Sequence, residues 1–92
     1  MMTEPVPEDR RTASIRRITG SGMRWRVMVE TWQESDAYHG RLLFHSETPE
    51  RERLDGARES APLLRGCSRT DVLARAHDVS EERLRQVLHS LG

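Results

Sequence analysis

Residues 63 to 92 constrain the fold most, because two serines there are placed to begin two consecutive helices. Ser68 stands where a helix N-cap would, with a hydroxyl that can accept from a free N–H of the first turn, and Asp71, three residues on, can reach back as in a capping box. Ser80 offers a second cap, followed by Glu81 and Glu82 in a turn that favours negative side chains. These signals predict helices at 69 to 77 and 81 to 91.

Apolar residues recur at helical spacing after both caps. In the second helix they form a clear stripe, which consists of Leu84, Val87, Leu88 and Leu91. An amphipathic helix of this kind needs an apolar surface to pack against. The two helices therefore predict a second layer elsewhere in the chain.

The segment from 23 to 46 can supply that layer, because its apolar residues alternate with polar ones. One set comprises Met23, Trp25, Val27, Val29, Tyr38, Gly40, Leu42 and Phe44. A period of two is typical of strands, and the polar stretch 33 to 37 between the two runs predicts a β-hairpin over 23 to 46. Trp32 falls on the face opposite Trp25, where it is either an exposed contact for a partner or a side chain tucked under the turn.

The segment 48 to 66 is ambiguous between helix and strand. Thr48, Pro49 and Glu50 resemble a helix start, but Gly56 interrupts the pattern. Residues 57 to 64 alternate weakly, and Pro62 suits an edge strand. We favour a turn of helix or loop at 49 to 55 and a third strand near 57 to 64.

Residues 1 to 22 contain few apolar groups, which predicts a flexible, disordered tail. Its arginines form a basic cluster that is either solvated or a phosphate-contacting arm, and these are Arg10, Arg11, Arg16 and Arg17. The whole pattern predicts an α+β fold. A single domain, 23 to 92, would have a three-stranded antiparallel sheet packed by the two C-terminal helices.

Charge and length exclude several classes of protein. The 15 basic residues, all Arg, balance the 15 acidic ones, so no global field points to nucleic acid or membrane. No apolar run approaches the roughly 20 residues needed to span a bilayer, and the start lacks the apolar region of a secretory signal. We expect a cytoplasmic protein, and a core this small would benefit from a protein partner or a homodimer.

Nothing in the sequence indicates an enzyme, a cofactor or a small-molecule substrate. Cys67 is the single cysteine, and a half-buried structural residue is a better interpretation than a reactive thiolate. His39 and His45 lie six residues apart, about 20 Å along a strand, which is too far to share a metal ion. No residue at a readable spacing offers a general base, so we expect no catalytic or metal site.

Two resemblances bear on function. The first resemblance is to DNA-binding helix-turn-helix proteins and covers about twenty residues. The positions that match the family's pattern are Leu73, Ala74, Val79, Ser80, Leu84 and Leu88. The resemblance implies that the second helix faces a groove with Arg83, Arg85, Gln86 and His89. Asp78 stands in place of the usual turn glycine.

The second resemblance is to HicB-like antitoxins, in which a β-sheet leads into a helix packed across it. The matching positions are Gly66, Ser68, Asp71 and Ala76. This resemblance implies a small ribonuclease toxin as the partner, although the family's Pro-Asp segment is missing here.

The sequence thus favours a small non-catalytic protein-interaction or regulatory module. The alternatives are a DNA-binding regulator that uses the C-terminal helices and an antitoxin-like partner of a toxin. DNA binding through arginines should weaken steeply as salt rises, whereas an apolar interface should tolerate salt.

Overall fold

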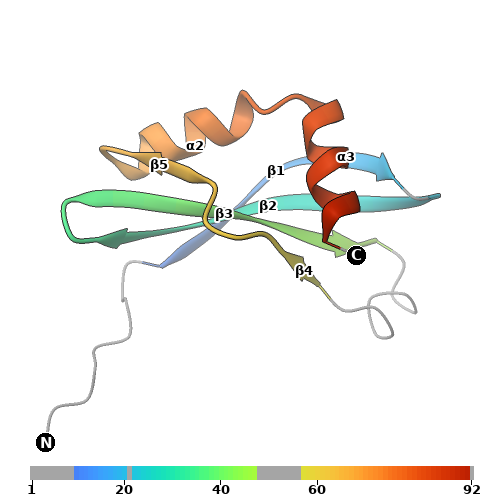
Figure 1. Cartoon of the computed structure of the whole chain (residues 1–92), viewed down its shortest axis with the longest axis horizontal. Helices are drawn as coiled ribbons and strands as arrows, with labels where there is room; N and C mark the ends of the chain where they lie inside the picture. Colours follow the sequence, from blue (N-terminus) through green and yellow to red (C-terminus); the bar gives the residue numbers. More distant parts are fainter. Residues whose placement is uncertain (1–9, 21, 48–56, 92) are drawn as a thin grey trace, which may run out of the picture.

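The computed structural model describes residues 10 to 20, 22 to 47 and 57 to 91, and it has the expected α+β architecture (Figure 1). Its elements in chain order are β1 (Arg11–Gly20), β2 (Met23–Glu34), β3 (Ala37–Ser46), β4 (Arg58–Glu59), β5 (Leu64–Gly66), α2 (Arg69–His77) and α3 (Glu81–Ser90). The strands form one antiparallel sheet in the order β1-β2-β3-β4, and β5 also pairs with β3. Both helices lie on the same side of that sheet (Figure 1).

The predicted hairpin is confirmed. Strands β2 and β3 pair along their whole length, with Val27 opposite Phe44 and Val29 opposite Leu42. Ser35 and Asp36 make the connection, in which Ser35 adopts a left-handed φ of 58°. A two-residue connection of this kind matches the twist of the flanking strands.

The prediction of a tail over residues 1 to 22 is wrong for residues 11 to 20, which form the edge strand β1 paired with β2. Its register shifts between Ser14 and Arg16, so Ile15 is an extra residue in a β-bulge. The bulge breaks the period of two, and Ile15 and Ile18 both pack on the core although they are three residues apart. Residues 1 to 9 lie outside the described residues.

The third strand predicted near 57 to 64 is present as two short strands, β4 and β5, on the same edge of β3. Ser60 separates them, because its hydroxyl accepts from the N–H of Leu42 at 2.9 Å while its own N–H donates to the Leu42 carbonyl. Pro62 has no N–H to donate, and regular pairing resumes at Leu64. The turn or loop expected at 49 to 55 lies outside the described residues.

Both predicted helices are confirmed, with the serine caps in place. The Ser68 hydroxyl accepts from the Asp71 N–H at 3.0 Å, and that of Ser80 accepts from the Arg83 N–H at 3.1 Å. The Asp71 carboxylate reaches back to the N–H of Cys67 at 3.1 Å. This hydrogen bond, together with nearby Arg75, holds the pKa of Asp71 below its usual value.

The core lies between the helices and one face of the sheet. Its largest fully buried side chains include Trp25 and Phe44 from the hairpin and Leu84 and Leu88 from α3. Gly40 lets α2 approach β3, because a Cβ at this position would lie 2.6 Å from Cγ1 of Val72. The predicted packing of the hairpin against both helices is therefore correct.

Candidate functional site

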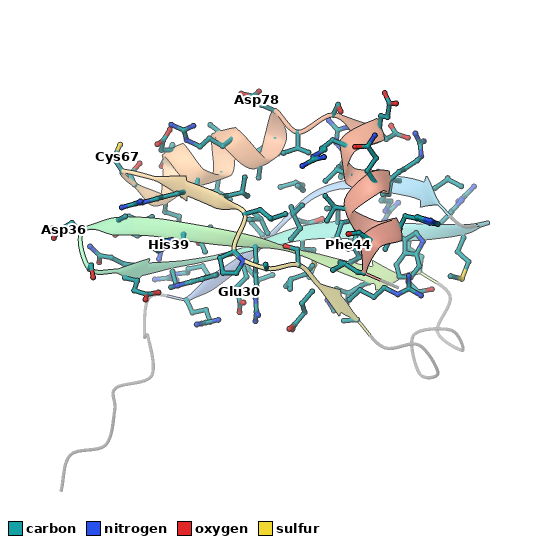
Figure 2. The ribbon with its side chains drawn as sticks, viewed as in Figure 1. Glu30, Asp36, His39, Phe44, Cys67 and Asp78 are labelled. Carbon is teal, nitrogen blue, oxygen red and sulfur yellow. The ribbon has the colours of Figure 1, made fainter. Side chains whose placement is uncertain are left out.

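The second face of the sheet is the candidate site, because no helix or strand among the described residues covers it. Figure 2 shows Glu30 and His39 on this side, away from α2 and α3. Side chains alternate along each strand, so residues paired across the strands share a face and form rows. Several of these rows carry charge. One holds the exposed Arg24, in register with Thr19, and two others differ in how their charge is balanced.

The first, which we call the Glu30 row, consists of Thr12, Glu30 and Arg41 in register across β1, β2 and β3. Glu30 accepts from Arg41 at 2.7 Å and from Arg10 at 3.1 Å. Arg41 also lies 3.3 Å from the carboxylate of Glu59 on the neighbouring strand β4. Charges of opposite sign meet throughout this row, which stabilises the pairing of the strands.

The second, which we call the Arg26 row, consists of Arg17, Arg26 and His45 in register across the same strands. Arg17 and Arg26 are direct cross-strand neighbours of like charge, an arrangement that destabilises a sheet. Arg17 pairs with Glu47 at 2.7 Å. Arg26 makes no ion pair within the described part of the chain, so the positive charge of this row exceeds its negative charge.

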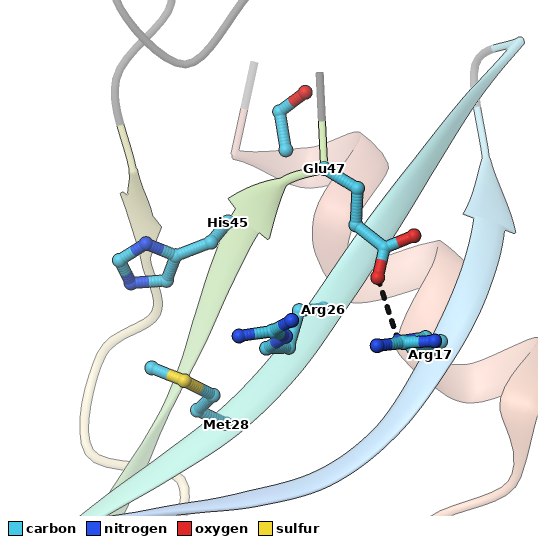
Figure 3. Close-up of a pocket in the computed structure, with 6 residues that line it drawn as sticks. Arg17, Arg26, Met28, His45 and Glu47 are labelled. Carbon is cyan, nitrogen blue, oxygen red and sulfur yellow. Dashed lines mark ion pairs between the residues drawn. The ribbon is translucent and has the colours of Figure 1, made fainter. Parts of the chain in front are cut away.

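The Arg26 row borders a hollow of about 450 Å³ (Figure 3). Its lining consists of Arg17, Arg26, Met28, His45, Ser46 and Glu47. Figure 3 shows the Arg17 and Glu47 side chains directed toward each other at one margin and Arg26 between them and His45. The hollow is therefore a basic depression on the uncovered face, with one internal carboxylate at its rim.

Trp32 lies on the uncovered face, as predicted, but it is not an exposed anchor. Only 7% of its surface is accessible, because the Arg10 guanidinium lies 4.8 Å from its ring centroid and His39 stacks on it at 6.0 Å. Its indole N–H donates to Glu34 at 3.3 Å. The second interpretation, a tryptophan tucked in near the turn, describes the structure.

Large apolar side chains are otherwise covered. Among the described residues only Leu63 is an exposed large hydrophobic residue, with 53% of its surface accessible. An extensive exposed apolar patch, which a salt-tolerant apolar interface would require, is therefore not present in the described part of the chain.

The four predicted groove contacts on α3, namely Arg83, Arg85, Gln86 and His89, are all exposed. Arg85, however, donates to the Thr19 carbonyl at 2.7 Å and pairs with Glu81. Because Thr19 belongs to the edge strand β1, Arg85 ties α3 to that edge and shields it from further pairing. Arg83 bonds to Gln86 at 3.3 Å along the helix surface.

The N-terminal arginines do not form the predicted cluster, since the strand and its bulge separate them. Arg10 joins the Glu30 row, and Arg17 joins the Arg26 row. Arg11 and Arg16 are in register with Thr31 and Val27, whose side chains belong to the helix-covered face. These four arginines therefore do not form one continuous group, which the predicted phosphate-contacting arm would require.

Sequence reasoning missed Arg24, Arg26, His45 and Glu47 as site residues. The alternation in the hairpin already placed Arg24, Arg26 and His45 on the face opposite Trp25, which was the available signal, whereas Glu47 lies beyond the predicted hairpin of 23 to 46. Their functional interest depends on Arg17, and its position beside Arg26 is set by the unpredicted strand β1.

The remaining chemical groups do not assemble into a site. Cys67 is exposed and not half-buried, and its thiol lies 3.7 Å from the Asp71 carboxylate. Among the described residues no group of three His, Cys, Asp or Glu side chains is placed to hold a metal ion. Neither described helix has the length and apolar character needed to cross a membrane.

Comparison with known proteins identifies no relative: the chain matches no family model, no curated protein and no solved structure.

Proposed function

We propose that the protein is a non-catalytic binding module that recognises a protein partner through the uncovered face of its sheet. One observation carries the proposal: the like-charged pair Arg17 and Arg26 lies on a face that the helices leave open. Like charges placed side by side cost stability, so an acidic partner that neutralises them would gain affinity from relieving this cost.

The composition of the face suits this role. Arginine and methionine are enriched at protein interfaces, and Arg24, Arg26 and Met28 follow one another along the face on β2. Because exposed apolar area is small, the partner should present acidic groups and not a hydrophobic side chain. Binding should then weaken as salt rises, so salt dependence alone does not separate this module from a DNA-binding protein.

A DNA-binding regulator is the second candidate, favoured by the exposed surface formed by Arg83, Gln86 and His89 on α3. Against it, Arg85 is already committed to Thr19 and Glu81, and acidic residues open the helix. The antitoxin interpretation has less support. Three of its matching residues, Ser68, Asp71 and Ala76, are accounted for by helix capping and core packing.

The test separates the two surfaces by position. A photo-crosslinking amino acid is placed at Thr12 or Thr19 on the uncovered face and at Gln86 on α3, and the full chain is expressed in cells of its source organism. We expect a protein adduct from the sheet positions, and none from Gln86. The captured protein is then purified, and its affinity is measured for Arg26→Glu and for the matched variant Arg83→Glu.

The expected result is at least a tenfold loss of affinity for Arg26→Glu, about 1.4 kcal/mol, with little change for Arg83→Glu. Adducts from Gln86 alone would overturn the proposal. So would duplex DNA binding that is lost in Arg83→Glu and retained in Arg26→Glu, because it would assign the function to α3. Light scattering on the free protein identifies a second copy of the chain if that is the partner.

A further inference from the structure

The Arg26 row supports an inference about the chemical group that it binds, which is more specific than an acidic partner. Its residues come from three adjacent strands, and neighbouring strands lie about 4.8 Å apart. The side chains of Arg17, Arg26 and His45 thus stand within about 10 Å of one another at their origin. All three side chains line one hollow (Figure 3).

Glu47 is the acidic group that the Arg26 row already binds. Its carboxylate approaches Arg17 at 2.7 Å, and the Arg17 side chain remains 68% exposed. A single internal carboxylate therefore neutralises one of the two arginines and leaves Arg26 beside it. A ligand with close to two negative charges would match the row better than a second carboxylate, because it could contact both guanidinium groups.

A phosphate monoester has this chemistry, with a charge of about −1.5 to −2 at neutral pH and three acceptor oxygens. Arginine is well suited to it, because the planar guanidinium donates two parallel hydrogen bonds to phosphate oxygens. The hollow of about 450 Å³ has room for the phosphoryl group and the side chain that carries it.

The neighbouring rows argue for one discrete phosphate and against a nucleic acid backbone. On one side of the Arg26 row come Ser14, Met28 and Leu43, which carry no charge, and beyond them lies the Glu30 row, whose arginines are already paired. On its other side lies the exposed Arg24, in register with Thr19. A nucleic acid presents phosphates in succession and needs a track of unpaired cations. The described part of this face offers only a short track of this kind, because Arg24 and Arg26 are its two arginines without an ion pair.

We propose that the hollow at Arg17, Arg26 and His45 binds a phosphate monoester dianion, with Arg17 exchanging Glu47 for phosphate oxygens. The inference rests on the proposed function in one respect, since it names the group on a protein partner that the uncovered face would recognise. A free phosphorylated small molecule has the same chemistry, and the experiment below separates these two sources.

The test is a titration of the full ¹⁵N-labelled chain followed by NMR at pH 7.5. The probes are sodium phosphate, a pentapeptide with a central phosphoserine, and its unphosphorylated form, each against sodium chloride at matched ionic strength. Saturable shifts are expected at Arg17, Arg26 and His45, with phosphate and with the phosphopeptide. Arg26→Gln should weaken binding at least tenfold, whereas Arg83→Gln, the same change on α3, should not alter it.

Glu47→Gln supplies a variant that gains binding, because Arg17 then loses its internal competitor. Affinity for phosphate should rise severalfold. A phosphopeptide that binds more tightly than inorganic phosphate assigns the ligand to a protein segment, and equal affinity assigns it to a free phosphate compound. Both results support the site.

Shifts no larger than those with sodium chloride would overturn the inference, as would equal losses in Arg26→Gln and Arg83→Gln. A single-stranded oligonucleotide that binds more tightly than the phosphopeptide through the same residues would overturn the discrete site. If phosphate fails to bind while the partner captured from Thr12 or Thr19 is retained, the proposed function stands and only this inference falls.

Discussion

The two faces of the sheet follow different physical rules although they share the same strands. On the helix-covered face Trp25, Val27 and Phe44 are completely buried, so shape and volume determine what is tolerated. On the uncovered face charge decides, and the Glu30 row satisfies the rule of opposite cross-strand charges while the Arg26 row breaks it. This departure from a stabilising rule is the observation on which the proposed function rests.

The strongest test of the comparison places the same charge on each face. Leu84→Asp puts a carboxylate in the seam between α3 and the sheet, where the leucine is fully buried, and should unfold the protein. Met28→Asp, on the uncovered face, should keep a cooperative melt and cost about 1 kcal/mol. Thermal unfolding followed by circular dichroism distinguishes these outcomes, and a folded Leu84→Asp would show that α3 does not close the core.

Adding one methyl group on the helix-covered face should also lower the stability of the protein. Gly40→Ala places a Cβ 2.6 Å from Cγ1 of Val72, and overpacking of this kind costs about 1–3 kcal/mol. The double variant Gly40→Ala/Val72→Ala removes the colliding methyl group and should recover part of that loss in urea unfolding. If the single variant is as stable as the parent, α2 does not pack against β3 at this point.

Neutralising one charge in each row compares the two halves of the uncovered face. Glu30→Gln removes the negative charge that Arg10 and Arg41 share, on a side chain that is only 14% exposed, and leaves a neutral amide oxygen as their acceptor. The change should cost about 1 kcal/mol. Arg26→Gln removes like-charge repulsion with Arg17 and should be neutral or stabilise by about 0.2–1 kcal/mol. Equal destabilisation by both variants, measured by urea unfolding, would mean that the Arg26 row is as well balanced as the Glu30 row.

The smallest effect should come from a charge outside both faces. The pKa of Asp71 is lowered in the folded protein, by the Cys67 N–H and by Arg75, relative to an ordinary value of 3.8. Its contribution to stability is therefore complete above the ordinary pKa and is lost as the pH falls through the lowered, folded-state pKa. Acid unfolding curves of the parent and of Asp71→Asn should converge below about pH 4, and a constant separation down to pH 2 would contradict this.

Local signals sufficed for the hairpin and for both helices. The alternation around Trp25 and Phe44 identified two strands and their inner face, and the serines at 68 and 80 marked where each helix begins. These features depend on neighbours a few residues apart, so the sequence can be read for them directly. The split of the last strand at Ser60 was not predictable, because it depends on hydrogen bonds with Leu42 across the sheet.

The candidate site was only half predictable for the same reason. Sequence alone determined that Arg26 and His45 share a face opposite the core, because a period of two fixes which side chains point the same way. Only the tertiary structure decided that Arg17 lies beside Arg26, because β1 is a weakly apolar edge strand whose bulge hides its periodicity. Strand β1 forms by hydrogen bonding to β2, and the Arg26 row exists only once these two strands are paired.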